Sequence, residues 1–162
     1  MRTTTLDLFK EEMKFSAAHF TIFSATEREN LHGHNFTVRV SLRTTVERDG
    51  LCFDYGECKR LIIAQCRDWN ETTLLPERSA HLKVAHEGGY VVALFGQERL
   101  LFLPRDVKLL PIENVTLEEL SQLFMERLLE RMPPDHKRQL QSMRVRVFSG
   151  PGQSASAEWR PA

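Results

Sequence analysis

Alternating apolar and polar residues mark several stretches of this chain as β-strands. Residues 36–42 alternate strictly, and residues 142–149 do the same near the C-terminus. Side chains two apart on a strand lie on one face, so each of these strands has one face for a core and one for solvent. The strands predicted in these regions are 3–23, with a bend or bulge at 10–12, then 34–47, 142–149 and 154–159.

Two other stretches carry apolar residues at the spacing of a helix. Residues 55–69 place Ile62 and Trp69 on one side, which is typical of a helix packed on a core. Asp54 is the expected N-cap of this helix. A capping box predicts the start of a second helix, which is expected to cover residues 116–131.

The region between the helices is predicted to start as a loop and to continue as hairpins. Residues 70–76 follow the first helix and are expected to open the loop. The strand-like stretches 81–85, 90–95 and 100–104 are separated by glycine-containing turns, which is the pattern of two β-hairpins.

This order of elements predicts one domain of the α+β class over residues 1–162. We expect an antiparallel four-stranded sheet with two helices packed on one face. A chain of 162 residues is long enough to bury such a core by itself. The sheet would have two unpaired edges, through which copies of the chain can associate.

Charge and composition narrow the classes of partner. The 22 basic residues balance the 22 acidic residues, and no basic run stands out, which argues against nucleic acid as the main partner. No apolar stretch approaches the roughly 20 residues of a membrane-spanning helix, so we expect a cytoplasmic protein with no membrane partner. Cys52, Cys58 and Cys66 lack Cys-x-x-Cys spacing and are expected to be reduced thiols.

The most informative pattern is a pair of histidines, His32 and His34, at the start of a predicted strand. On a strand both imidazoles point into one space, and Gly33 between them leaves the other face open. His19 ends another strand-like segment that can fold back beside the first. Three imidazoles with a fourth position open are the ligand set of a catalytic zinc site. The alternative interpretation is three unrelated surface or core histidines.

Acidic residues stand before the histidine pair and after the first predicted helix. Glu29 lies three residues before His32, so its carboxylate either reaches the metal or is solvated, whereas solvation is the favoured interpretation of Glu27. Glu71 follows a helix C-terminus, where a carboxylate is unfavourable with respect to the helix dipole. Exposure to solvent is the ordinary explanation of such a position.

Five segments of the chain together carry a family resemblance. They are 15–19 (Phe-Ser-Ala-Ala-His), 31–35 (Leu-His-Gly-His-Asn), 50–55 (Gly-Leu-Cys-Phe-Asp-Tyr), 114–118 (Asn-Val-Thr-Leu-Glu) and 152–156 (Gly-Gln-Ser-Ala-Ser). The chain resembles the 6-pyruvoyl tetrahydropterin synthase family, which includes the bacterial 6-carboxytetrahydropterin synthases of queuosine synthesis. The resemblance covers most of the sequence.

The resemblance implies a tunnelling fold (T-fold), trimers whose sheets join into a barrel, and hexamers made of two trimers with active sites at subunit interfaces. It implies Zn²⁺ held by His19, His32 and His34, and a substrate similar to 7,8-dihydroneopterin triphosphate. Thr116 and Glu118, which lie in a matched segment, are expected to bind this pterin-like substrate together with Ser149.

The sequence departs from the family pattern at three places. Most members carry a cysteine shortly before the histidine pair, whereas this chain has Glu29 and looks like a variant subgroup that makes 6-hydroxymethyl-7,8-dihydropterin. The family's Asp-His pair falls on Asn70 and Glu71, and its pterin-anchoring glutamate falls on Ser149. Glu118 is a candidate replacement for that anchor, since a carboxylate can pair with the guanidine-like edge of a pterin.

These residues together predict a zinc-dependent lyase. Zinc would lower the pKa of the substrate hydroxyls, Glu29 would be the base, and Glu71 would be a second acid/base group. Glu29 would need a pKa raised by partial burial to act near neutral pH. Carbon–carbon cleavage and loss of triphosphate both fit, and the missing cysteine favours cleavage. The alternative is a repurposed or inactive T-fold protein that keeps zinc and binds a different small heterocycle.

Overall fold

The computed structural model describes residues 2–162, which form ten strands and three α-helices. The strands are β1 (Arg2–Leu8), β2 (Lys14–His19), β3 (His32–Val46), β4 (Thr72–Pro76), β5 (Leu82–Glu87), β6 (Tyr90–Phe95), β7 (Glu98–Phe102), β8 (Val107–Leu110), β9 (Leu140–Phe148) and β10 (Ser154–Trp159). The helices are α1 (Gly56–Trp69), α2 (Leu117–Arg131) and α3 (Pro134–Gln139), and a short 3-10 helix covers Pro104–Asp106.

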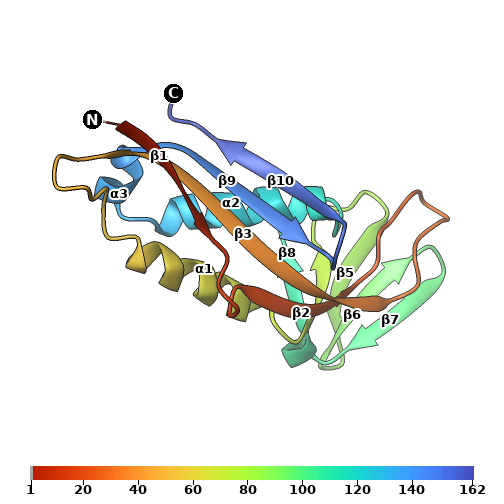
Figure 1. The fold of residues 1–162 in the computed structure, drawn as a ribbon. Helices are drawn as coiled ribbons and strands as arrows, with labels where there is room; N and C mark the ends of the chain where they lie inside the picture. Colours follow the sequence, from red (N-terminus) through yellow and green to blue (C-terminus); the bar gives the residue numbers. More distant parts are fainter. Residues whose placement is uncertain (1) are drawn as a thin grey trace.

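Seven of these strands form one sheet, with the long strand β3 near its centre (Figure 1). Neighbouring strands follow the order β10-β9-β3-β2-β4-β8, and β1 pairs with the second half of β3 while β2 pairs with its first half. The pairings of β2 with β4 and of β4 with β8 are parallel, and the others are antiparallel. Among residues 2–162, β10 and β1 therefore leave free edges on opposite sides of the antiparallel part.

The prediction of a single strand over residues 3–23 is wrong in one respect, because this segment forms two strands, β1 and β2. The chain turns between them, where the Met13 N–H donates to the Lys10 carbonyl at 2.9 Å. The predicted bend at 10–12 is thus confirmed. The buried side chain of Met13 explains the turn, since it draws this segment onto the core.

Helices α1 and α2 lie on one face of the sheet, as predicted (Figure 1). Phe36 and Val38 on the inner face of β3 are at most 2% exposed. Trp69 of α1 makes edge-to-face contacts with Phe15 and with Phe124 of α2, at ring-centroid distances of 5.4 and 5.5 Å. Aromatic contacts of this kind join both helices to the sheet around one core.

The start of α2 follows the sequence pattern closely. The Thr116 hydroxyl accepts a hydrogen bond from the Glu119 backbone N–H at 3.3 Å, which confirms the predicted cap. At α1 the N-cap is Tyr55 rather than Asp54. The Asp54 carboxylate still accepts a hydrogen bond from the Gly56 N–H at 2.8 Å, so it serves the first turn from one residue further away.

Strands β5, β6 and β7 form a separate antiparallel sheet at one end of the molecule (Figure 1), which confirms the two predicted hairpins. This small sheet packs on a second apolar cluster, which includes Phe20, Leu75, Val91 and Phe95. Phe20 follows β2 and Leu75 belongs to β4, so the cluster joins the small sheet to the large one.

The α+β class and the antiparallel layer with two helices on one face are confirmed, but the strand count differs from the four expected. The expected loop over 70–76 contains β4, which lies beside β2, and β8 extends the sheet further. Such short apolar runs carry no periodicity that separates a parallel strand from a loop. Helix α3 was also not predicted. None of the helices in residues 2–162 is long and apolar enough to cross a bilayer.

Candidate metal centre and active-site pocket

Strand pairing gathers the three histidines on one patch of the sheet. β2 and β3 pair in a register that sets His19 directly opposite His32 and Ala17 opposite His34. Because side chains alternate along a strand, His32 and His34 share a face. Phe36 continues this face into the core, and its ring packs edge-on against His34 at a centroid distance of 5.5 Å. The histidines therefore lie where the core ends.

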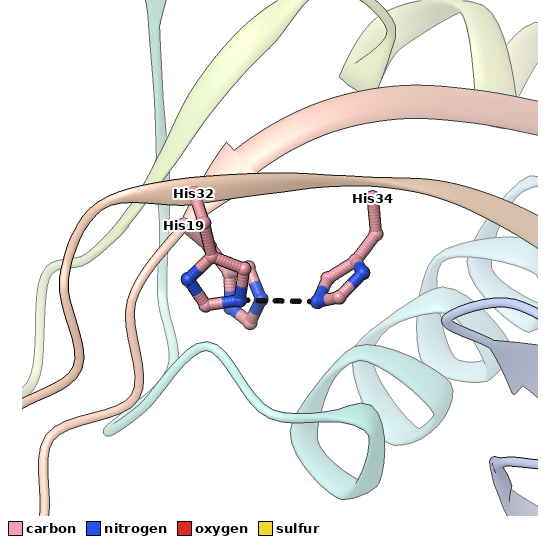
Figure 2. Close-up of side chains that lie close together, drawn as sticks. All are labelled: His19, His32 and His34. Carbon is pink, nitrogen blue, oxygen red and sulfur yellow. Dashed lines mark hydrogen bonds between the residues drawn. The ribbon is translucent and has the colours of Figure 1, made fainter.

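The three imidazole rings converge on one point (Figure 2). Ring centroids are 4.7 Å apart for His19 and His32, 4.8 Å for His32 and His34, and 5.3 Å for His19 and His34. The Nε2 atoms of His32 and His34 are 3.1 Å apart. Two nitrogens that bind the same tetrahedral metal ion at zinc–nitrogen distances are about 3.3 Å apart, so this spacing suits a shared ion.

Backbone carbonyls orient two of the rings. His19 Nδ1 lies 2.8 Å from the Val115 carbonyl oxygen, and His32 Nδ1 lies 2.7 Å from that of Asn30. A carbonyl only accepts, so each Nδ1 carries the proton and each Nε2 presents a lone pair. Metal-binding histidines are held in this way.

The His19 ring gives a test of whether the site fits a metal. Its Nε2 is buried and has no hydrogen-bond partner within residues 2–162. Burial lowers the pKa of His19, which favours the neutral ring. A buried lone pair without a partner costs free energy, and a metal ion would satisfy it. The donor set and the unpartnered atom both fit a bound metal ion.

Glu29 lies beside the trio, and its carboxylate faces the histidine pocket. Its Oε2 atom is 4.0 Å from His32 Nε2 and accepts a hydrogen bond from the Thr21 N–H at 2.8 Å. The Glu29 N–H donates to the Thr21 carbonyl at 2.9 Å, next to an isolated bridge between Ile22 and Arg28. These bonds hold an acid next to the candidate ligands, whereas Glu27 is exposed.

The pKa of Glu29 is lowered, contrary to the upward shift that was expected. Burial by itself raises this pKa, but hydrogen bonds from Thr21 and the neighbouring His32 and His19 outweigh burial and bring it below the usual value. The carboxylate is therefore ionised at neutral pH and ready to accept a proton.

Arg28 fixes the segment that carries Glu29. Its side chain, 16% exposed, donates to the Glu98 carboxylate through Nε at 2.9 Å and Nη2 at 2.6 Å. Nη1 donates to the Glu29 carbonyl at 2.8 Å. The guanidinium also lies over the rings of Phe20 and Phe95, at 4.9 and 5.7 Å. Since Glu98 begins β7, Arg28 ties the Glu29 segment to the small sheet.

A pocket of about 330 Å³ opens over the histidines, between the β2–β3 face, the start of α2 and the β9–β10 hairpin. All three residues expected to bind substrate, Thr116, Glu118 and Ser149, line this pocket together with Glu29. The structure thus brings together residues that are more than a hundred positions apart in the sequence.

Several residues of the pocket were not predicted. Gln153 and Ser154 line it, and their only signal was the family resemblance of the segment around them. Thr21 contributes its backbone N–H, for which a sequence offers no signal. Asn114 supports the site, since its side chain donates to the Ile22 carbonyl at 2.8 Å and accepts from the Ile22 N–H at 3.1 Å.

Glu71 lies outside this pocket. The Asn70 side-chain oxygen accepts from the Ser16 N–H at 2.8 Å, and the Glu71 N–H donates to the Ser16 carbonyl at 2.7 Å. Both residues therefore cover the side of β2 that faces away from β3. Glu71 has a φ of 57°, which is uncommon for a residue other than glycine, and its side chain is exposed. Within one chain, the expected second acid/base group stands apart from the histidines.

All three cysteines are free, as expected. Burial raises the pKa of the Cys58 thiol to about 11 and that of Cys66 to about 12. Both lie on the buried side of α1, so they pack as small apolar groups and are not nucleophiles at neutral pH.

A family model described as 6-pyruvoyl tetrahydropterin synthase matches residues 8–159. The chain belongs to the 6-pyruvoyl tetrahydropterin synthase family. A Pyrococcus abyssi relative, provisionally named a 6-carboxy-5,6,7,8-tetrahydropterin synthase, is 28% identical, with 85% of this chain and 81% of the relative covered. A Methanocaldococcus jannaschii relative with the same provisional name is 25% identical, with 88% of each chain covered.

Solved structures of this family share the fold. The 6-pyruvoyl tetrahydropterin synthase of Plasmodium vivax has a TM-score of 0.93 at 25% identity, with 99% of this chain and 100% of that chain covered. The Plasmodium falciparum protein has a TM-score of 0.91 at 25% identity, with 98% and 99% covered. In two further Plasmodium vivax structures, a glutamate that is a catalytic residue is replaced by alanine or by cysteine. The expected T-fold is confirmed.

We expect the histidine trio to bind one divalent metal ion per chain. His34→Ala removes one of three donors and should weaken metal binding by at least about tenfold, measured by elemental analysis after dialysis against limiting metal. His86→Ala is the matched control, because His86 is exposed on β5, and it should leave the metal content unchanged. Equal metal loss in both variants would contradict this site.

We expect Arg28→Ala to lower the free energy of unfolding by about 1–2 kcal/mol, because it removes hydrogen bonds and packing from a mostly buried guanidinium. Urea denaturation measures this change. The control is Arg105→Ala, because the Arg105 side chain is 82% exposed and its one ionic contact within residues 2–162 is with Asp106 at 3.7 Å. Its loss should cost less than about 0.5 kcal/mol. Similar costs for the two variants would show that Arg28 does not secure the Glu29 segment.

Proposed function

We propose that this chain is a zinc-dependent lyase that acts on 7,8-dihydroneopterin triphosphate or a closely related pterin, and that it cleaves the side chain to give 6-hydroxymethyl-7,8-dihydropterin. The observation that carries the proposal is the ionised carboxylate of Glu29 beside the three convergent histidines. The catalytic glutamate of the Plasmodium vivax relative supports this role for a glutamate.

The donor set favours zinc among the metals. His19, His32 and His34 offer three imidazole nitrogens, which is the ligand set of zinc sites that keep a position open for substrate. Zinc bound there supplies a Lewis acid that lowers the pKa of the substrate's side-chain hydroxyls. Glu29 remains free to act, since its Oε2 is held by the Thr21 N–H beside the trio and not among the ligands.

Glu29 acts as the base in the proposed reaction. Its ionised carboxylate accepts the proton of the side-chain hydroxyl one carbon away from the carbon that bears the ring, and the oxygen becomes the carbonyl of the leaving aldehyde as the carbon–carbon bond breaks. The electron pair of that bond stays on the carbon attached to the pterin ring, which takes up a proton to become the hydroxymethyl group. A carboxylate of lowered pKa is a weak base, so it suits a hydroxyl that has already been made more acidic. This match explains why the site does not need the raised Glu29 pKa that the sequence led us to expect.

Glu118 and Thr116 are proposed to bind the pterin ring. Both line the pocket at the first turn of α2. A carboxylate pairs with the guanidine-like edge of a pterin through two hydrogen bonds. Glu118 takes this role because Ser149, which also lines the pocket, is a serine at the position of the family's anchoring glutamate.

We propose that copies of the chain assemble as a ring, a trimer or a hexamer of two trimers, through the free edges of β1 and β10. Unpaired edges of antiparallel sheets join readily. The pocket extends from the β2–β3 face to β10, where Ser154 lines it, while Glu71 lies next to Ser16 on the side of β2 that faces away from β3. Joining the two edges brings Glu71 of one copy toward the pocket of the next, where it can act as the second acid/base group.

The proposed role of Glu29 is tested by Glu29→Gln, which keeps an acceptor for the Thr21 N–H but cannot take up a proton. We expect kcat to fall by about 10²–10⁴-fold while the zinc content stays the same. Purified protein is incubated with zinc and 7,8-dihydroneopterin triphosphate, and products are identified by mass spectrometry. Glu27→Gln, at an exposed position of the same segment, should keep full activity, and equal rates for the two variants would remove Glu29 from the mechanism.

The second candidate function is a repurposed T-fold protein that binds zinc and a different small heterocycle. Ser149 in the pocket favours it, because a hydroxyl cannot form the charge-assisted pair that anchors a pterin. The same mass-spectrometric experiment separates the two functions. Zinc-loaded wild-type protein that releases no product from dihydroneopterin triphosphate would favour the repurposed protein.

The shared site is tested by mixing two variants, Glu29→Gln and Glu71→Gln. Each alone should be inactive, because each lacks one acid/base group at every site. Co-expression at equal amounts should restore about a quarter of the wild-type activity, since a site whose two groups come from neighbouring copies is then intact in about one case in four. Full activity of Glu71→Gln alone would exclude Glu71, and no recovery in the mixture would contradict a site between copies.

A further inference from the structure

A second hollow lies on the face of the sheet opposite to the histidines, and its walls are basic. The hollow has a volume of about 430 Å³ and lies over β1, β3, β9 and β10. Its side chains alternate along β3 and β9 with buried core residues such as Val40 and Val145, so they face away from the helices. We call this surface the arginine face; its arginines are Arg39, Arg43, Arg144, Arg146 and Arg160.

On the arginine face the positive charges of the arginines outnumber the negative charges of the carboxylates. Asp7 and Glu158 are the carboxylates that line the hollow, so five arginines against two carboxylates leave an excess of three positive charges. The chain as a whole has a formal net charge of 0. The excess is therefore a local property of this face and not a reflection of a basic protein.

The two carboxylates are already paired. Glu158 accepts from both Arg144 and Arg160, at 2.9 Å each. Asp7 accepts from Arg39 at 2.8 Å through Oδ2, and its other oxygen accepts from the Ser41 hydroxyl. Neither acid has an oxygen that is free of such a bond.

Arg146 and Arg43 remain without an acid. Among residues 2–162, no carboxylate oxygen lies within 4.0 Å of either guanidinium. Arg146 also stands directly opposite Arg39 in the pairing of β9 with β3, and like charges that face each other across two strands are destabilising. Asp7 bonds to Arg39 and not to Arg146, so it offsets one of these two charges, and a further negative charge between the two side chains would offset the other.

We propose that the arginine face binds an inorganic oligophosphate, seated between Arg39 and Arg146 with Arg43 at one end. Guanidinium groups bind phosphate oxygens in forked pairs of hydrogen bonds, which a halide ion cannot accept in the same way. A chain of phosphate groups supplies several charges along the hollow and so offsets the excess of three. Among residues 2–162 the lining of the hollow includes no aromatic side chain, and one ring, that of Phe9, lies 4.8 Å from the Arg39 guanidinium. A single ring is not the series of stacking platforms that single-stranded nucleic acids use.

The site is separate from the proposed reaction. Glu29, the histidines and their pocket lie on the other face of the sheet, with the core between the strands and the helices. Binding of an oligophosphate to the arginine face therefore requires neither turnover nor the histidine trio to be catalytic, and a failure of one proposal leaves the other untouched.

The test is a titration of the metal-loaded protein with sodium tripolyphosphate. Isothermal calorimetry measures the affinity, and thermal unfolding measures the shift of the unfolding midpoint. Sodium chloride at matched ionic strength is the reference. We expect tripolyphosphate to raise the midpoint, and Arg146→Gln to weaken binding at least tenfold. Arg146→Lys should weaken it less, because it keeps the charge but loses the fork. Metal analysis before and after the titration excludes extraction of the metal ion by the ligand.

Control variants separate this site from other basic positions. Arg131→Gln changes an exposed arginine at the end of α2, on the helical side, and should leave binding unchanged. Arg146→Gln removes a repulsion and should fold; if it does not, Arg43→Gln at an exposed position of β3 takes its place. An equal response to chloride, unchanged binding by Arg146→Gln and Arg43→Gln, or tighter binding of an oligonucleotide than of tripolyphosphate would overturn the proposal.

Discussion

The register in which β2 pairs with β3 is the constraint on which both the core and the metal centre depend. It sets His19 opposite His32 and Phe15 opposite Phe36 on the same face. The two phenyl rings stack at 4.9 Å, and each residue is 1% exposed. A slip by one residue would turn a whole strand to the other face, exposing a ring and separating the histidines. The buried aromatic pair therefore determines where the imidazoles point.

Strand β3 contributes to the metal centre, to the core and to the arginine face, because its two faces carry different side chains. Its inner face begins with His32 and His34 and continues as core through Val40, while its outer face carries Arg39 and Arg43. The apolar burial of the inner face supplies the stability that allows charged residues to crowd on the outer face. The functional side chains are thereby placed on a strand whose position is fixed by the packing of its inner face.

The sequence was sufficient to predict those features that depend on residues close together in the chain. Period two predicted that His32 and His34 share a face, and the strand-like segment that ends at His19 supplied the third candidate ligand. The environment of Glu29 could not be predicted, because its pKa depends on the backbone N–H of Thr21, a donor that every residue type but proline offers equally. The place of Glu71 was also out of reach, since it follows from the parallel pairing of β4 with β2, a contact between distant segments.

Burial of His19 links folding, pH and metal binding. The folded-state pKa of His19 lies below its ordinary value of 6.5 because burial disfavours the charged ring. Between 6.5 and the folded-state pKa of His19, the unfolded chain binds more protons than the folded chain. The free energy of unfolding therefore decreases as the pH falls through this interval. The proton would occupy Nε2, the lone pair that faces His32 and His34. A metal ion satisfies the same atom without charging the ring and stabilises only the folded chain. The conformation that buries His19 is thus also the one that binds the metal.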